Sequence, residues 1–221
     1  FMLVATPSGL SLAPEGGAHQ SIATPLIGMG QPGLTSFEPA FADELAEIMR
    51  WGFDHMQADD GGAVYLRLST LALAQPKRTM AAKLRKEILA GAYWREKPGK
   101  KSKGAIIYTG ALAGEAAAAH ASLADDGIGL LAVTSADTLC RDWRGRGEKS
   151  HLARLLSDLS PDARLVTVLD GHPAALSWAG SVAGHRTRAL GVDQFGQCGD
   201  VKELYRAYGI DAAAIESAFT R

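Results

Sequence analysis

The segment MLVATPSGLSLAPEGGAHQSIATPLIG, residues 2–28, is the stretch from which we deduce the fold of this chain. Its apolar start, Met2–Ala5, predicts a short buried strand. The paired glycines within Glu15-Gly-Gly-Ala-His19 predict a loop, and Thr24–Gly28 is expected to return the backbone towards the core. Ligands bind where loops follow the strands of an α/β sheet. We therefore interpret this loop, with its carboxylate, imidazole and hydroxyl groups, as part of an active site.

Strand and helix patterns alternate after this loop. Apolar and β-branched residues predict strands at 34–37 and 63–68. Between them, apolar residues recur at helical spacing from Pro39, and Glu38 is expected to face the positive end of that helix. This order of strand, loop, strand, helix and strand corresponds to half of a doubly wound α/β domain.

The pattern changes in the middle of the chain and then repeats. Residues 79–90 predict a helix, 92–95 a short edge strand, and the lysine-rich segment 97–103 a solvated linker. Beyond it, strands are predicted at 105–109, 129–134, 164–169 and 187–192, helices at 110–124, 151–159, 174–184, 201–208 and 212–219, and a mobile loop at 144–149. We therefore divide the chain into a domain at 1–75, a linker at 76–103 and an α/β domain with a mainly parallel sheet at 104–221.

Composition excludes several classes of protein. The formal net charge of −1 gives no reason to expect nucleic acid or a membrane as partner. Cys140 and Cys198 make no disulfide framework and have no metal-ligand spacing around them, and no apolar run is long enough to span a membrane. No phosphate-binding GxxxxGK[ST] loop and no GxSxG elbow occurs, which excludes the hydrolases that depend on them. We expect a cytoplasmic protein.

The segment VATPSGLSLAPEGGAHQ, residues 4–20, resembles the pyrimidine-domain loop of thiamine-diphosphate enzymes of the transketolase and 2-oxo acid dehydrogenase group. The loop of that family has a Thr, a Gly-rich acidic turn, and an acidic residue four positions before a catalytic His. Thr6, Glu15 and His19 match these positions. The similarity continues through TSFEPAFADE (35–44), AVYLRLST (63–70), GVDQFG (191–196) and LYRAYGID (204–211).

This resemblance implies the second half of a pyrimidine-binding, doubly wound domain followed by a transketolase C-terminal-like α/β domain. It implies that His19 and Glu15 are catalytic, since an imidazole can stabilise or protonate a reacting oxygen near neutral pH. Gln20 and Ser21 are then candidates for binding the substrate. His172, in Asp170-Gly-His172, follows a predicted strand, and we expect it to start a helix or to pack, not to catalyse.

The resemblance also implies thiamine diphosphate and Mg²⁺ as cofactors. In the family a Gly-Asp-Gly segment in a separate N-terminal domain holds the metal and the diphosphate, and this sequence has no such segment. We therefore expect the chain to be a C-terminal fragment, inactive by itself. Its implied partners are a second copy in a homodimer and the lipoyl acyltransferase component of a multienzyme complex.

Two departures from the family pattern concern the substrate. Sugar-phosphate transketolases have a second His where Pro7 stands and an Arg where Thr70 stands, and both would bind a phosphate. Their replacement, together with a Glu before His19, favours a small 2-oxo acid and the homodimeric pyruvate dehydrogenase type. Two alternatives stay open: a transketolase that transfers two-carbon ketol units between sugar phosphates, and a non-catalytic assembly module of the same fold.

Overall fold

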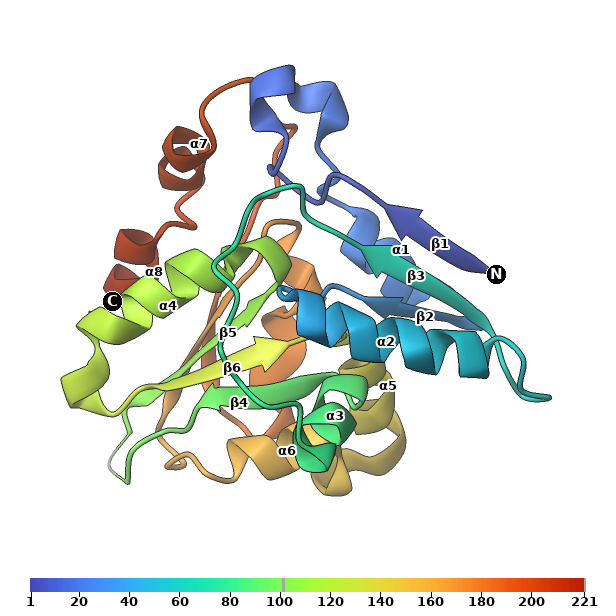
Figure 1. Cartoon of the computed structure of the whole chain (residues 1–221). Helices are drawn as coiled ribbons and strands as arrows, with labels where there is room; N and C mark the ends of the chain where they lie inside the picture. The colour runs from blue at the N-terminus through green and yellow to red at the C-terminus, as the bar shows by residue number, and fades with distance from the viewer. Residues whose placement is uncertain (101, 221) are drawn as a thin grey trace.

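The protein is described by a computed structural model over residues 1–100 and 102–220, and it contains two β-sheets (Figure 1). The first sheet is parallel and has the order β1-β3-β2, formed by Met2–Ala5, Ala63–Arg67 and Leu34–Phe37. The second has the order β4-β6-β5-β7-β8, and β4 is its antiparallel strand. These strands are β4 (Ala92–Glu96), β5 (Gly104–Thr109), β6 (Gly129–Val133), β7 (Arg164–Val168) and β8 (Arg186–Leu190).

Helices α1 (Thr24–Gly30) and α2 (Ala42–His55) pack against the first sheet, and α5 (Ala136–Arg146) also contacts its strand β2. Glu44 caps α2, since its Oε2 accepts hydrogen bonds from the backbone N–H groups of Ala40 (2.8 Å) and Phe41 (3.0 Å). The expectation that Glu38 serves this helix end is wrong, because Glu38 lies buried between the two sheets. The apolar spacing thus predicts the helix correctly but not its cap.

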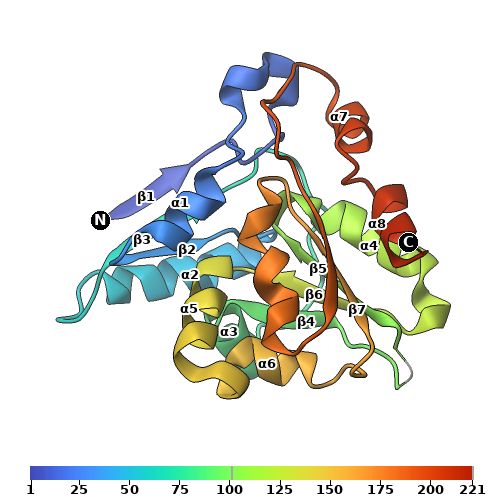
Figure 2. The same ribbon diagram turned by 180° about the vertical axis from the view of Figure 1, so that it is seen from behind.

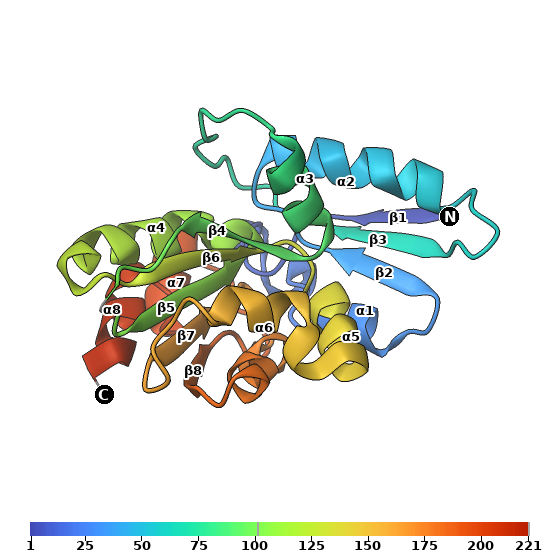
Figure 3. The same ribbon diagram turned by 90° about the horizontal axis from the view of Figure 1, so that it is seen from below.

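Helices cover both faces of the second sheet (Figures 2 and 3). On one face lie α4 (Ala113–Ser122) and α8 (Ala212–Thr220), and on the other α6 (His151–Leu156) and the 3₁₀ turns Pro173–Ala175 and Ser177–Val182. Alternate strand residues serve the two faces, so that Ile106 packs with the first layer and Ile107 with the second. The remaining helices are α3 (Ala82–Leu89) and α7 (Val201–Ala207).

One hydrophobic core runs through both sheets. Phe37 and Leu66 of the first sheet belong to the same buried cluster as Ile106 and Tyr108 of the second. The predicted edge strand at 92–95 is confirmed as β4, which pairs with β6. Lys101, in the predicted lysine-rich linker, lies outside the described residues. This core packs the carboxyl ends of the first sheet against the second unit.

Three local expectations are wrong. Met2–Ala5 is a strand but not a buried one, because it is the edge strand of its sheet and leaves Leu3 and Val4 each 52% exposed. The predicted mobile loop at 144–149 is the end of α5 and a 3₁₀ turn. Residues 174–184 form 3₁₀ turns and no α-helix.

No helix in the described part of the chain is both long and apolar enough to cross a membrane.

Candidate active-site loop

The loop between β1 and α1 lies at the carboxyl end of the first sheet, at the top of Figure 1. It contains two 3₁₀ turns, Ala13–Glu15 and Gly17–His19. A backbone bridge between Gly9 and Ser21 closes its base. The Ser21 hydroxyl accepts a hydrogen bond from Gly9 N (3.2 Å) and donates one to Pro7 O (3.1 Å). The loop is therefore a closed unit with a defined stem.

The four residues predicted to form the site lie on this loop in two different environments. Glu15 and His19 are exposed, and within residues 1–100 and 102–220 neither side chain forms a hydrogen bond. Gln20 is half-buried and donates from Nε2 to Gln197 O (2.9 Å), while its Oε1 is buried without a partner among the described residues. Ser21 uses its hydroxyl proton within the stem. The structure thus leaves His19 accessible and does not join it to Glu15.

The stem of the loop is fixed by contacts with both sheets. Leu10 N donates to Asp170 Oδ1 (2.7 Å) after β7, and Ser8 N donates to Leu68 O (2.8 Å) after β3. Gly9 has a φ of +44° and passes so close to Asp170 that a Cβ would lie 2.0 Å from its backbone oxygen. Glycine is required there by both the conformation and the close approach. The exposed turns therefore stand on a rigid, buried base.

A second loop, residues 191–200, packs against the first. Gly196 lies so near Gln20 that a Cβ on Gly196 would be 1.4 Å from Gln20 Oε1, and the Cys198 thiol donates to Pro14 O (3.2 Å). Phe195 is 84% exposed beside Gly17. In the sequence, residues 191–196 of this segment contributed only to the family resemblance, because the contact with the first loop joins residues far apart in the chain. We count Phe195 as a side chain that sequence reasoning missed.

The junction of the two sheets contains a buried charge cluster, which we call the Arg67 cluster and which consists of Arg67, Glu38 and Asp170. Arg67 is 2% exposed, and its Nη1 pairs with Glu38 Oε1. Its Nη2 donates to Ser21 O (2.9 Å) and to Asp170 O (2.6 Å). Its Nε donates to Thr24 Oγ1 (3.0 Å). One guanidinium thus ties the loop stem, the start of α1 and both sheets together.

Burial shifts the titration of both acids in the Arg67 cluster. Loss of solvation raises the pKa of Glu38 to about 7, against the lowering effect of Arg67 and with a further rise from the charge of Asp170. Loss of solvation likewise raises the pKa of Asp170 to about 6, which Arg67 and the Leu10 N–H oppose. With two acids and one arginine, the cluster changes its net charge near neutral pH. The sequence signal for it was Arg67 inside an otherwise apolar strand.

The described residues do not fit the metal that accompanies the implied cofactor. No group of three His, Cys, Asp or Glu side chains among residues 1–100 and 102–220 could hold a metal ion. The cavity beside Arg67 and Glu38 measures about 20 Å³, which is enough for roughly one water molecule and too small for a cofactor ring.

His172 has the helix-start position expected from the sequence. Its Nδ1 accepts from Ala174 N (3.2 Å) at the beginning of the turn Pro173–Ala175.

Comparison with known proteins gives matches in sequence and in structure, while no protein-family model matches the chain. The pyruvate dehydrogenase E1 component of Escherichia coli K12 is 26% identical over 229 residues, which cover 97% of this chain and 26% of the relative. The chain spans about a quarter of the length of the curated relatives that it matches.

Two solved structures show the same fold. The transketolase of Campylobacter jejuni superposes with a TM-score of 0.77 at 17% identity, over 99% of this chain and 31% of that one. A split-gene transketolase, described as an inactive beta4 tetramer, superposes with a TM-score of 0.63 at 18% identity, over 99% of this chain and 65% of that one. The mixed α/β fold with mainly parallel sheets is thus confirmed. In sequence and in fold, the chain resembles the thiamine-diphosphate-dependent transketolase and 2-oxo acid dehydrogenase superfamily, as the loop sequence indicated.

Proposed function

We propose that this chain is the C-terminal part of a thiamine-diphosphate-dependent pyruvate dehydrogenase component, which decarboxylates a 2-oxo acid and passes on the acyl group. The observation that carries the proposal is the exposed imidazole of His19 on an anchored loop, in a chain that matches a pyruvate dehydrogenase E1 component over 97% of its length. Thiamine diphosphate, when bound, supplies the electron-sink chemistry at the carbonyl carbon.

The role of this chain would be to orient the substrate and to move protons. His19 would donate a proton to, or stabilise, the oxygen of the 2-oxo group, because an imidazole can both donate and accept a proton. Glu15, also exposed on the loop, would contact the reacting groups from the neighbouring turn. Gln20 and Ser21 stay predictions as substrate-binding residues. To bind the substrate, Gln20 would have to give up its hydrogen bond to Gln197 O, and Ser21 would have to give up its hydrogen bond to Pro7 O.

The substrate proposed is a small 2-oxo acid such as pyruvate. Pro7 and Thr70 both lie at the loop stem, where the Thr70 hydroxyl donates to Ser11 O (3.2 Å) and the Pro7 carbonyl accepts from Ser21. Neither side chain carries a cation that could bind a sugar phosphate. The neighbouring Arg67 is engaged in four hydrogen bonds to protein groups. This stem therefore favours a substrate without a phosphate group.

The test uses the complete enzyme that contains this chain. His19→Ala should lower pyruvate turnover by roughly 10²- to 10⁴-fold, the usual contribution of one positioned acid or base, with little change in cofactor affinity. The matched control is His55→Ala, which removes an imidazole that stacks on Trp51 in α2 and should leave turnover unchanged. Near-normal turnover of His19→Ala would contradict the catalytic role. A preference for xylulose phosphate over pyruvate would assign the chain to the transketolases.

A second candidate is a non-catalytic assembly module. The exposed Leu3 and Val4 on edge strand β1 favour it, since apolar side chains on a free strand edge promote association. The similar split-gene transketolase is described as an inactive tetramer. Light scattering should show a dimer or larger assembly that Leu3→Lys weakens and Phe53→Lys, on α2, does not. If the missing enzyme part restores pyruvate turnover to the chain, the module is excluded.

A further inference from the structure

Three arginines lie together at the amino-terminal end of the second sheet, opposite the candidate active-site loop. Arg164 begins β7 and stands directly across from Arg186, which begins β8. Arg188 follows two positions later and therefore points to the same face of the sheet as Arg186. Arg186 and Arg188 are exposed, because β8 is the edge strand and α8 covers its inner neighbour. We call these three residues the arginine triad.

The arginine triad has no acidic counter-charge in the described part of the chain. No carboxylate among residues 1–100 and 102–220 lies within 4.0 Å of any of its guanidinium groups. Arg164 donates from Nη1 to Phe219 O (3.0 Å) and Ala218 O (3.4 Å), which places a positive charge at the end of α8. Like charges directly opposite in a sheet are destabilising. Protection of the edge strand needs charge on β8 but does not explain why Arg186 stands directly across from Arg164.

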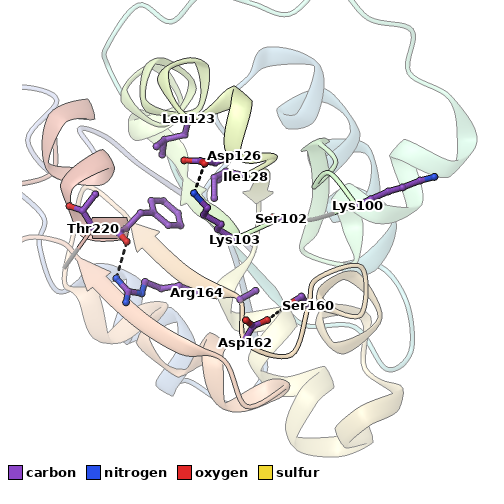
Figure 4. A pocket seen from close by; sticks show the side chains of 12 residues that line it. Lys100, Ser102, Lys103, Leu123, Asp126, Ile128, Ser160, Asp162, Arg164 and Thr220 are labelled. Carbon is purple, nitrogen blue, oxygen red and sulfur yellow. Dashed lines mark hydrogen bonds and ion pairs between the residues drawn. The ribbon is translucent and has the colours of Figure 1, made fainter.

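Two cavities meet at Arg164. One, of about 220 Å³, is lined by Arg164, Arg186, Thr187, Arg188 and Ala218. The other, of about 610 Å³, is drawn in Figure 4, where Arg164 reaches towards Thr220 and Lys103 pairs with Asp126. Lys100 lines the same cavity. The triad thus borders recessed, mainly positive space instead of a flat surface.

We propose that the arginine triad binds a small ligand with two linked phosphoryl groups. Each guanidinium offers a planar fork of donors that matches phosphoryl oxygens, and two linked phosphoryl groups carry several negative charges on adjacent oxygens. One carboxylate would neutralise only one of the three arginines, whereas a diphosphate group can contact all of them. The ligand is either free diphosphate or the diphosphate of a nucleotide, because both present the same oxygens to the triad.

The test measures binding of inorganic diphosphate to the chain by calorimetry, without magnesium and at low salt. Arg186→Gln combined with Arg188→Gln should weaken binding at least tenfold, whereas Arg186→Lys with Arg188→Lys should keep part of it, since charge remains without the fork. The matched control replaces two exposed lysines of α3, Lys83→Gln with Lys86→Gln, and should bind as the unchanged protein does. Thermal melting of each variant confirms that it is folded.

The source of the ligand is decided by adding ADP to the same series. If ADP binds more tightly than diphosphate and loses affinity in the Gln variant, the natural ligand is a nucleotide; if diphosphate binds more tightly, it is the free anion. The proposal is overturned if diphosphate does not bind at millimolar concentration. It is equally overturned if the Lys83 and Lys86 control weakens binding as much as the arginine variant, because diphosphate would then respond to the net charge of the protein and not to the arginine triad.

Discussion

Arg67 Nη2 donates a hydrogen bond to the backbone oxygen of Asp170 at 2.6 Å, and so joins the last residue of β3 to the segment after β7. The side chain of the same Asp170 accepts from Leu10 N in the stem of the candidate loop. Two residues that are distant in the chain thus hold together both sheets and the loop between them.

Replacement of Arg67 by Met should lower the free energy of unfolding by about 3 to 5 kcal/mol, because it leaves the buried carboxylate of Glu38 without its partner and removes the positive charge that offsets buried Asp170. The comparison variant is Arg50→Met, whose side chain is 64% exposed and pairs with Glu47; it should cost less than about 1 kcal/mol. Urea unfolding followed by tryptophan fluorescence measures both. Equal effects of the two variants would show that the Arg67 cluster adds nothing to stability.

The Arg67 cluster should also make stability fall as pH rises. The pKa of Glu38 is about 7 in the folded chain against an ordinary 4.5, and that of Asp170 is about 6 against 3.8. The folded state therefore binds more protons between these values, and the contribution present at low pH is lost as pH rises through them. Glu38→Gln should make this decline shallower between pH 5 and pH 8, and the exposed Glu148→Gln should not. Unfolding curves across this range give the slope of stability against pH for each variant. If the slope for Glu38→Gln equals that of the unchanged protein, as expected for Glu148→Gln, the Arg67 cluster does not cause the decline.

Gly9→Ala should destabilise the chain much more than Gly33→Ala. Both glycines have positive φ, +44° and +76°, which costs an L-residue roughly 1–2 kcal/mol. At Gly33 an added Cβ meets nothing within 4 Å, whereas at Gly9 it lies 2.0 Å from Asp170 O. Overpacking adds about 1–3 kcal/mol, so we expect about 2 to 5 kcal/mol for Gly9→Ala. Similar melting temperatures for the two variants would mean that the loop stem can move away from Asp170.

The isolated chain should show no magnesium-dependent binding of thiamine diphosphate, since its described residues offer no group of three metal ligands. Calorimetric titrations with and without Mg²⁺ measure this directly. Binding that needs no magnesium and disappears with Arg186→Gln and Arg188→Gln would belong to the arginine triad. Tight binding that requires magnesium would contradict the proposal that the rest of the cofactor site lies on another part of the enzyme.

The order of strands and helices was predictable because it depends on local periodicity. Runs of apolar and β-branched residues at 105–109 and 164–169 identified β5 and β7, and helical spacing after Pro39 identified α2. The glycines and the Glu15–His19 spacing identified the loop and the resemblance. These signals lie within a few residues of each other, so that the sequence displays them directly.

What the sequence did not display depends on contacts between distant segments. Glu38 stands directly before Pro39, and this position suggests an acid at the start of a helix. Its partner in the structure is Arg67, which is 29 positions away in the chain. The glycines and charges of residues 144–149 suggest a mobile loop, although Asp142 pairs with Arg146 and accepts from His151 N (2.5 Å), which fixes the turn after α5. A local sequence pattern does not predict which distant residues come into contact when the two sheets pack together.

The backbone carbonyl of Asp170 accepts a hydrogen bond from Arg67, and its carboxylate accepts one from Leu10 N. The position of the loop therefore depends on how the two sheets pack against each other. A substitution that tilts one sheet against the other, however far it lies from Glu15 or His19, would reach the loop through Asp170 and through the hydrogen bonds of Ser8 to Leu68 and of Arg67 to Ser21. Variants in the shared core can thus impair turnover while every side chain of the loop is intact.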